Sequence, residues 1–155
     1  MQALFIGQTY IDMTFVTGHT PVGEEKAVAD DTACEQMNMD SERMLAHRKT
    51  RGLRVGGVTE GERGMLWCDD SGRMSRMPAV PVPKDGVIDT SGAGDIYHGA
   101  YVASRVLRPN EPWSEHFRFA RAAAAYKIQV LGDEAGLPSL ADIANVRQVY
   151  ETRAA

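Results

Sequence analysis

The 155-residue sequence lacks the features that would direct it to a membrane, a nucleic acid or a cysteine-held metal centre. No apolar run approaches the roughly 20 residues that a membrane-spanning helix needs, and the first residues lack the pattern of a signal peptide. The formal net charge of −4 gives no basic footprint for nucleic acid. The two cysteines, Cys34 and Cys68, have no metal-ligand spacing, so we expect reduced thiols in a cytoplasmic protein.

What remains is typical of one globular domain, with an apolar fraction of 43% and a charged fraction of 25%. The patterns predict strands at residues 4–7, 53–59, 65–68, 74–77 and 87–88, with weaker candidates at 13–16 and 25–29. They predict helices at residues 41–50, 95–108, 112–131 and 139–150. This order predicts an α/β domain with a largely parallel sheet. We expect Lys127, near the end of an alanine-rich helix, to bond the terminal carbonyls of that helix.

A glycine-rich turn, DTSGAGD at residues 89–95, lies between the predicted strand at 87–88 and a predicted helix. Glycine lets successive N–H groups point into one concavity, and the positive end of a helix dipole strengthens such an anion site. Asp95 places a carboxylate beside it, where it could take a proton from an attacking hydroxyl. Taken alone, the segment leaves open that Gly92 and Gly94 only form a tight turn and Asp95 only caps the helix.

In a wider window, residues 89–100 read DTSGAGDIYHGA and resemble the C-terminal signature of the ribokinase-like (PfkB) carbohydrate kinases. Ser91 and Tyr97 are mild departures from the usual form. The resemblance implies a three-layer α/β/α fold with a mainly parallel sheet. It also implies transfer of a phosphoryl group from ATP, with Mg²⁺, to a hydroxyl of a sugar or sugar-like small molecule.

The same resemblance implies roles for individual residues of the turn. Asp95 is the implied catalytic base, and the amides of Gly92, Ala93 and Gly94 are the implied anion hole for the transferring group. Asp89 matches a residue that helps to hold a monovalent cation in several members, so K⁺ is a further implied cofactor.

Two other segments resemble nucleotide-binding parts of the same family. Residues 58–64 resemble its Thr-x-Gly-x-x-Gly loop and supply Thr59, Gly61 and Gly64, although an ordinary strand-to-hairpin turn explains them equally well. Gly132 begins a loop that resembles the border of the adenine site. These four residues are therefore the expected cofactor-binding positions.

Near the start of the chain, Asp12 follows a segment that resembles the opening strand of the family. A carboxylate there can accept hydrogen bonds from vicinal sugar hydroxyls, so Asp12 is the candidate substrate-binding residue. A solvated loop aspartate is the alternative. Residues 23–26 resemble the start of the family's β lid.

The resemblance covers about residues 1–31 and 40–150, with a large internal gap in between. We interpret the chain as a single incomplete kinase domain that lost its middle by deletion, gene-model error or natural truncation. Residues 1–31 would be a first strand and lid remnant, and residues 40–150 the nucleotide-binding and catalytic part. We expect little turnover from this chain and self-association, for example as a homodimer, across its uncovered surfaces.

Two other classes of function compete with a kinase. A catalytically inactive nucleotide-binding or interaction remnant would keep the anion hole and lack a grip on substrate. A Rossmann oxidoreductase is disfavoured, because the glycine cluster lies late in the chain and no G-x-G-x-x-G follows the first strand.

Overall fold

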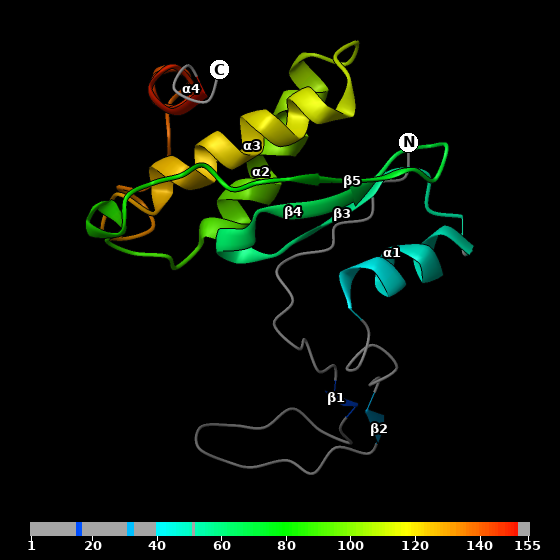
Figure 1. The fold of residues 1–155 in the computed structure, drawn as a ribbon. Coiled ribbons are helices and arrows are strands. Elements are labelled where there is room, and N and C mark those ends of the chain that lie inside the picture. The colour runs from blue at the N-terminus through cyan, green and yellow to red at the C-terminus, as the bar shows by residue number, and fades with distance from the viewer. Residues whose placement is uncertain (1–14, 17–30, 33–39, 51, 152–155) are drawn as a thin grey trace.

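A computed structural model describes residues 15–16, 31–32, 40–50 and 52–151 of the chain (Figure 1). The predicted strands at 4–7 and 25–29, the predicted lid start at 23–26, and Asp12 lie outside these residues. Near the N-terminus, β1 (Phe15–Val16) pairs antiparallel with β2 (Asp31–Thr32). This short pair falls within the predicted lid region, and its role as a lid stays a prediction.

A three-stranded antiparallel sheet forms the centre of the described fold, in the order β3 (Gly56–Thr59), β4 (Met65–Cys68) and β5 (Met74–Met77). Thr59 lies opposite Met65, which in turn lies opposite Met77. A turn with Gly72 at φ +84° joins β4 to β5. The predicted hairpin is thus confirmed, and the strand predicted to begin at residue 53 begins at Gly56.

Helices lie against both faces of this sheet because its side chains alternate. On one face Leu66 and Cys68 pack with Leu45 of α1 (Ser41–Thr50). On the other face Met65 packs with residues of α2 (Ala93–Leu107) and α3 (Trp113–Lys127), among them Phe117. The sheet therefore lies between α1 and the α2–α3 pair (Figure 1).

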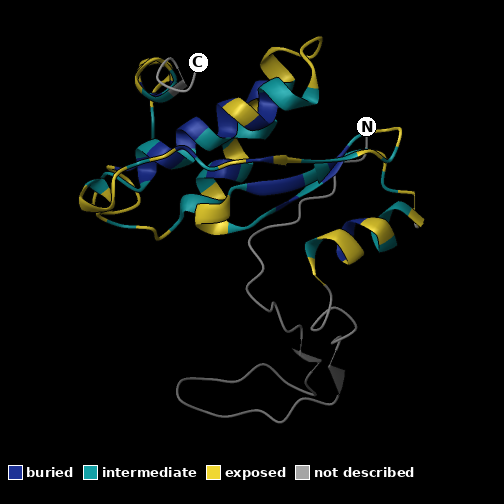
Figure 2. Cartoon of the chain, viewed as in Figure 1, coloured by how far each residue is buried: buried dark blue, intermediate teal, exposed yellow. Residues whose placement is uncertain are grey.

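The alanine-rich helix α3 is the most buried of the described helices (Figure 2). Ala120, Ala122 and Ala123 are fully buried, which allows the neighbouring elements to approach closely. One side of α3 packs on α2, and another packs on Ile143 and Val146 of α4 (Leu140–Glu151). Helix α3 ends at Lys127, four residues before the predicted end, and its chain continues in turns. Short 3-10 turns, η1 (Gly61–Arg63) and η2 (Lys84–Gly86), complete the described elements.

Several helix boundaries follow from local sequence signals. Asp40 caps α1, because its Oδ1 accepts the Arg43 amide at 2.8 Å, and Gly52 at φ +92° follows the helix end. Ser139 and Asp142 form a capping box at the start of α4. The Ser139 amide donates to Asp142 Oδ2 at 2.8 Å, and the Asp142 amide donates to Ser139 Oγ at 3.2 Å.

The predicted parallel sheet is not found among the described residues, where every strand pair is antiparallel. Val87 and Ile88, predicted as a short buried strand, form no strand and are exposed. A strand needs a neighbour for its ladder, and the Ile88 amide instead donates to the Ile128 carbonyl at 2.7 Å.

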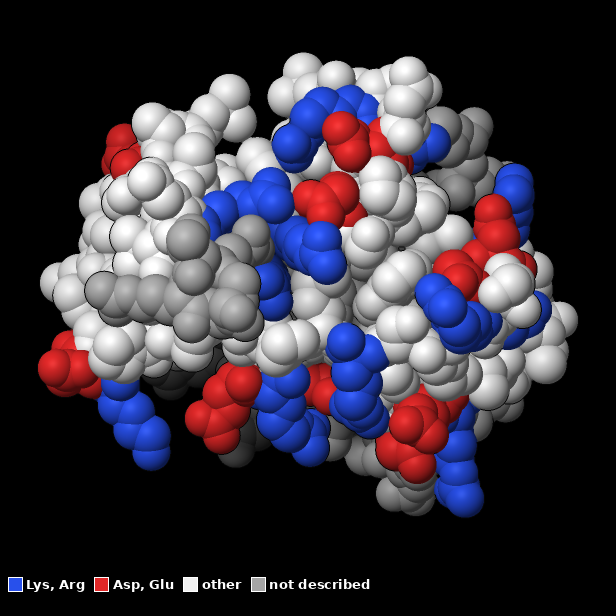
Figure 3. Space-filling model, turned by 45° about the horizontal axis from the view of Figure 1, so that its top comes forward, with Lys and Arg blue, Asp and Glu red and all other residues white. Residues whose placement is uncertain are grey.

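The charged side chains on the surface of the described part are mixed in sign, in keeping with the small net charge of −4. Acidic and basic side chains are interspersed on the face shown in Figure 3. None of the described helices is long and apolar enough to span a membrane.

Candidate active site

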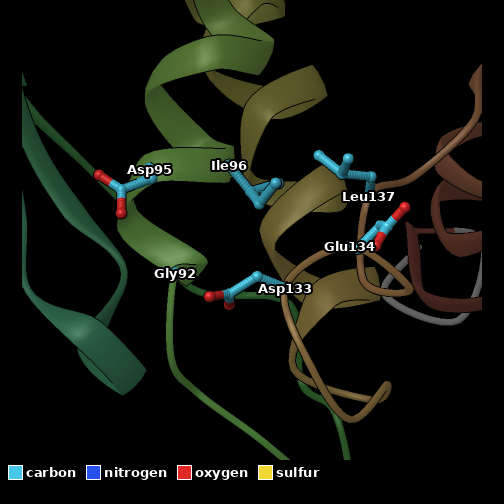
Figure 4. Close-up of a pocket in the computed structure, with 6 residues that line it drawn as sticks. All are labelled: Gly92, Asp95, Ile96, Asp133, Glu134 and Leu137. Atoms are coloured by element: carbon cyan, nitrogen blue, oxygen red, sulfur yellow. The ribbon is translucent and has the colours of Figure 1, made fainter.

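A pocket of about 380 Å³ opens between the start of α2 and the loop that joins α3 to α4 (Figure 4). Helix α2 and the turn before it contribute Gly92, Asp95 and Ile96. The loop after α3 contributes the other three residues, which are Asp133, Glu134 and Leu137. Two segments about 40 residues apart in the sequence therefore meet at the predicted phosphate turn.

The backbone of the turn has the geometry that an anion site needs. Gly92 is the N-cap of α2 and has φ +67°, and no side chain caps the helix. The amides of the first helical turn thus lie at the positive end of the helix dipole without a capping side chain. One of them, Ala93 N–H, makes a long bond of 3.3 Å to the Thr90 carbonyl. Asp95 is exposed in that same first turn, on the wall of the pocket.

Beneath the turn, the carboxylate of Asp89 joins three segments. Its Oδ1 accepts the Ser91 amide at 2.9 Å, and its Oδ2 accepts both the Gly132 amide and the Lys127 ammonium at 3.0 Å. The hydrogen bond from the Ser91 amide, followed by those from Lys127 and Gly132, lowers the pKa of Asp89 well below its usual range. Asp89 is therefore ionised at neutral pH and holds the turn to the loop after α3.

The position of Lys127 differs from the prediction, which placed its ammonium on the carbonyls that end α3. The side chain is fully buried, and its Nζ lies 3.0 Å from Asp89 Oδ2 and 3.8 Å from Asp133 Oδ1. A buried ammonium is stable only where an opposite charge and hydrogen bonds replace its water, and the carboxylate of Asp89 provides both.

The loop after α3 is shaped around this lysine. A Cβ added to Gly136 would lie 2.2 Å from Lys127 Cδ and 2.8 Å from the Gly132 carbonyl oxygen. Gly132 itself has φ +84° with open space around it, which suits a position at the border of a ligand.

The residues predicted from the Thr-x-Gly-x-x-Gly resemblance lie at the β3–β4 end of the sheet and do not line this pocket. Gly64 has φ +91°, and a Cβ there would lie 2.1 Å from the Met77 carbonyl oxygen, so close packing already requires a glycine. Gly61 has φ +60° and open space around it. The Thr59 hydroxyl is buried and has no hydrogen-bond partner among the described residues.

A contact between Tyr97 and Met65 places this end of the sheet beside α2. The Tyr97 hydroxyl donates to Met65 Sδ at 2.7 Å, and Met65 lies opposite Thr59 in the sheet. Burial raises the pKa of Tyr97, which keeps the hydroxyl a neutral donor. The glycine-rich turn and the β3–β4 end of the sheet thus both lie next to α2. The turn is at the start of the helix, and the sheet end is on the other side of Tyr97.

The described residues contain no group of three or more histidine, cysteine, aspartate or glutamate side chains that could hold a metal ion. The pocket nevertheless has three carboxylates in its lining, those of Asp95, Asp133 and Glu134. Mg²⁺ in phosphoryl-transfer sites keeps several waters and binds one or two carboxylates together with substrate phosphates. This donor set fits an ion that arrives with a nucleotide.

Of the residues predicted from the sequence, Gly92 and Asp95 line this pocket, and their roles stay predictions. Three further residues at the pocket were not predicted as part of a site. Asp133 and Glu134 line the pocket, and Lys127 supports it from beneath. Lysine at the end of an alanine-rich helix is an ordinary surface pattern, so no spacing in the sequence points to its contact with Asp89, 38 residues earlier.

Comparisons with known proteins point to one family. The family model described as pfkB family carbohydrate kinase matches residues 31–140. The ribokinase of Lactococcus lactis is 34% identical over 86 residues, which are 56% of this chain and 27% of that protein. The cytidine kinase of Thermococcus kodakarensis is 29% identical over 82 residues, 53% of this chain and 28% of that protein.

Among solved structures, the ribokinase of Arabidopsis thaliana, complexed with ribose and ATP, superposes with a TM-score of 0.60 at 25% identity. That match covers 67% of this chain and 32% of the other. The matched parts thus span 27–32% of the length of these relatives. Because the family model matches 110 of the 155 residues, positions 31 through 140, the chain belongs to the pfkB family of carbohydrate kinases.

Proposed function

We propose that this chain carries the ATP-binding and catalytic end of a kinase that phosphorylates a hydroxyl of a sugar or sugar-like small molecule. One observation supports the proposal above the others. Asp95, which is exposed, lines the same pocket as Gly92, the N-cap of α2, which has φ +67°. The proposed general base and the proposed anion site would therefore be neighbours in the first turn of α2.

In the proposed mechanism, the first-turn amides at Gly92, Ala93 and Gly94 donate to oxygens of the transferring phosphoryl group, where the helix dipole favours negative charge. Asp95 accepts the proton of the attacking hydroxyl. Asp133 or Glu134 would hold Mg²⁺, directly or through water, and the ion when bound neutralises phosphate charge.

Further roles complete the proposed site. Thr59, with its unpartnered hydroxyl, and Gly61 would border the nucleotide from the sheet side, and Gly132 would border it from the loop after α3. Gly64 would act indirectly, by allowing the β3–β4 turn to pack on Met77. Asp12, outside the described residues, remains the proposed contact to substrate hydroxyls.

A second candidate, a nucleotide-binding remnant without turnover, is favoured by the share of the relatives that the chain covers, 27% of the ribokinase and 28% of the cytidine kinase. In-line positioning of a hydroxyl can contribute roughly 7–11 kcal/mol of barrier reduction, and Asp12 alone cannot fix a sugar. We therefore expect low turnover, and association through exposed apolar side chains such as Leu107 and Leu131.

Coupled ADP release across hexoses, pentoses and nucleosides, with light scattering in parallel, separates the two candidates. If the chain turns over, Asp95→Asn should lower the rate at least about 100-fold and leave MgADP affinity unchanged. The control Asp85→Asn, at an exposed carboxylate of η2, should have no effect. MgADP binding without release on any acceptor would favour the remnant, and Asp95→Asn turnover within about threefold of wild type would contradict the role of Asp95.

A further inference from the structure

The base of the pocket contains a positive charge that the mechanism above does not use. Lys127 is 0% exposed, and its ammonium bonds Asp89 Oδ2 at 3.0 Å, beside the Gly132 amide on the same oxygen. A Cβ on Gly92 would lie 3.9 Å from Lys127 Cε, so the lysine stem runs directly under the N-cap of α2. The charge thus lies below the turn that we propose to bind phosphate.

This arrangement bears on the K⁺ that the family resemblance implies at Asp89. A metal ion at Asp89 Oδ2 would have to share that oxygen with an ammonium and an amide N–H, both of which are donors. Two like charges on one carboxylate oxygen repel each other, and a buried site does not screen them. Nor is there space for the ammonium to move aside, because the loop at Gly136 is packed against the lysine stem. The residues present therefore do not fit a monovalent metal ion.

We propose that the Lys127 ammonium takes the place of a monovalent metal ion at Asp89, so that the phosphate turn is held in shape by a covalently attached cation and needs no K⁺. The ammonium carries the same single charge as a monovalent metal ion, and it lies close to two segments, the turn at Asp89 and the loop at Asp133. This inference rests on the proposed function for its effect on nucleotide binding, and on the described contacts alone for its effect on stability.

The test compares the 155-residue chain in KCl and in tetramethylammonium chloride at equal ionic strength, by thermal unfolding and by calorimetry with MgADP. The wild type should show the same unfolding midpoint and the same affinity in both salts. Lys127→Ala removes the charge and opens space for an ion. In tetramethylammonium it should lower the midpoint and weaken MgADP binding by about tenfold or more, the loss of one charged hydrogen bond. KCl should restore most of both losses.

Lys84→Ala, at an exposed lysine of η2, is the matched control and should behave as the wild type in both salts. A wild type that gains stability or MgADP affinity specifically from K⁺ would overturn the proposal, and this arm stands even if Lys127→Ala fails to fold. A folded Lys127→Ala protein whose losses K⁺ does not restore would also overturn it, because Lys127 would then be a packing residue. Absence of MgADP binding in every sample would count against the proposed function alone, since the unfolding midpoints still decide the role of Lys127.

Discussion

A Cβ added to Gly92 would lie 2.8 Å from Oδ1 of Asp133, so the N-cap of α2 and the loop after α3 are in near contact. Gly92 also has φ +67°, a backbone conformation that costs a residue with a side chain roughly 1–2 kcal/mol. The turn therefore depends on glycine for two separate reasons, its backbone conformation and its close approach to Asp133.

Gly92→Ala should lower the free energy of unfolding by about 1–2 kcal/mol and weaken MgADP binding, because the methyl group strains the backbone and displaces Asp133. Gly99→Ala is the matched control. Gly99 lies within α2 with no atom within 4 Å of an added Cβ, so alanine there should raise stability by roughly 0.5–1 kcal/mol. Urea unfolding of both variants measures this, and equal effects of the two would contradict the role of Gly92.

Removal of Mg²⁺ should weaken ADP binding by about tenfold or more, because three carboxylates line the pocket and repel a bare diphosphate. Glu134→Gln removes one of these charges and should reduce the difference in binding affinity between ADP and MgADP. Asp85→Asn, at an exposed carboxylate of η2, should not. Calorimetry with and without EDTA tests this, and an ADP affinity independent of Mg²⁺ in the wild type would argue against a nucleotide in this pocket.

Away from the pocket, the buried pair of Ser104 and His116 should make stability depend on pH. Ser104 Oγ lies 2.9 Å from His116 Nδ1, and burial, then Arg105 and Arg108, lower the pKa of His116 below its ordinary value. Between about pH 6.5 and the folded-state pKa, only the unfolded chain takes up a proton at this residue. His116 therefore contributes full stability above about pH 6.5 and progressively less as the pH falls below it.

His116→Asn, which can keep the hydrogen bond to Ser104, should lose less stability than the wild type as the pH falls. The free energy of unfolding is measured at about pH 7.5, 6 and 5, which lie above and below the ordinary histidine pKa. Its change with pH is the slope compared between the proteins. His47→Asn in α1 is the control and should keep the slope of the wild type. A slope in His116→Asn equal to that of the wild type would show that another group carries the pH dependence.

The elements that could be predicted from the sequence are those with local causes. Asp40 and Gly52 delimit α1 by capping and by a left-handed turn, and the turn before Met74 specifies the hairpin. The same holds for Gly92 and Asp95, because a strained turn and the helix that it begins are adjacent in sequence.

The features that could not be predicted depend on partners distant in the chain. Residues 87–88 are apolar enough for a strand, but only an adjacent strand would make them one, and the Ile88 amide bonds Ile128 instead. Similarly, Glu60 is an ordinary polar residue in the sequence. Its carboxylate is nevertheless buried, and its Oε2 lies 2.7 Å from Nη1 of Arg76. No local feature of the sequence indicates that Asp89 and Lys127 form a pair. The packing of α3 on α2 brings them together.

The start of α2 is proposed to bind the phosphates of a nucleotide through its backbone amides, and the variant Gly94→Val would block this contact. Gly94 lies in the first turn of α2 without a positive φ, so the helical backbone there is compatible with valine, which is a better helix former than glycine. Its branched side chain would nevertheless cover the first-turn amides. We predict saturable calorimetric binding of MgADP to the wild type and none to a folded Gly94→Val protein. Equal affinity of the two proteins, or no binding to the folded wild type, would contradict the claim.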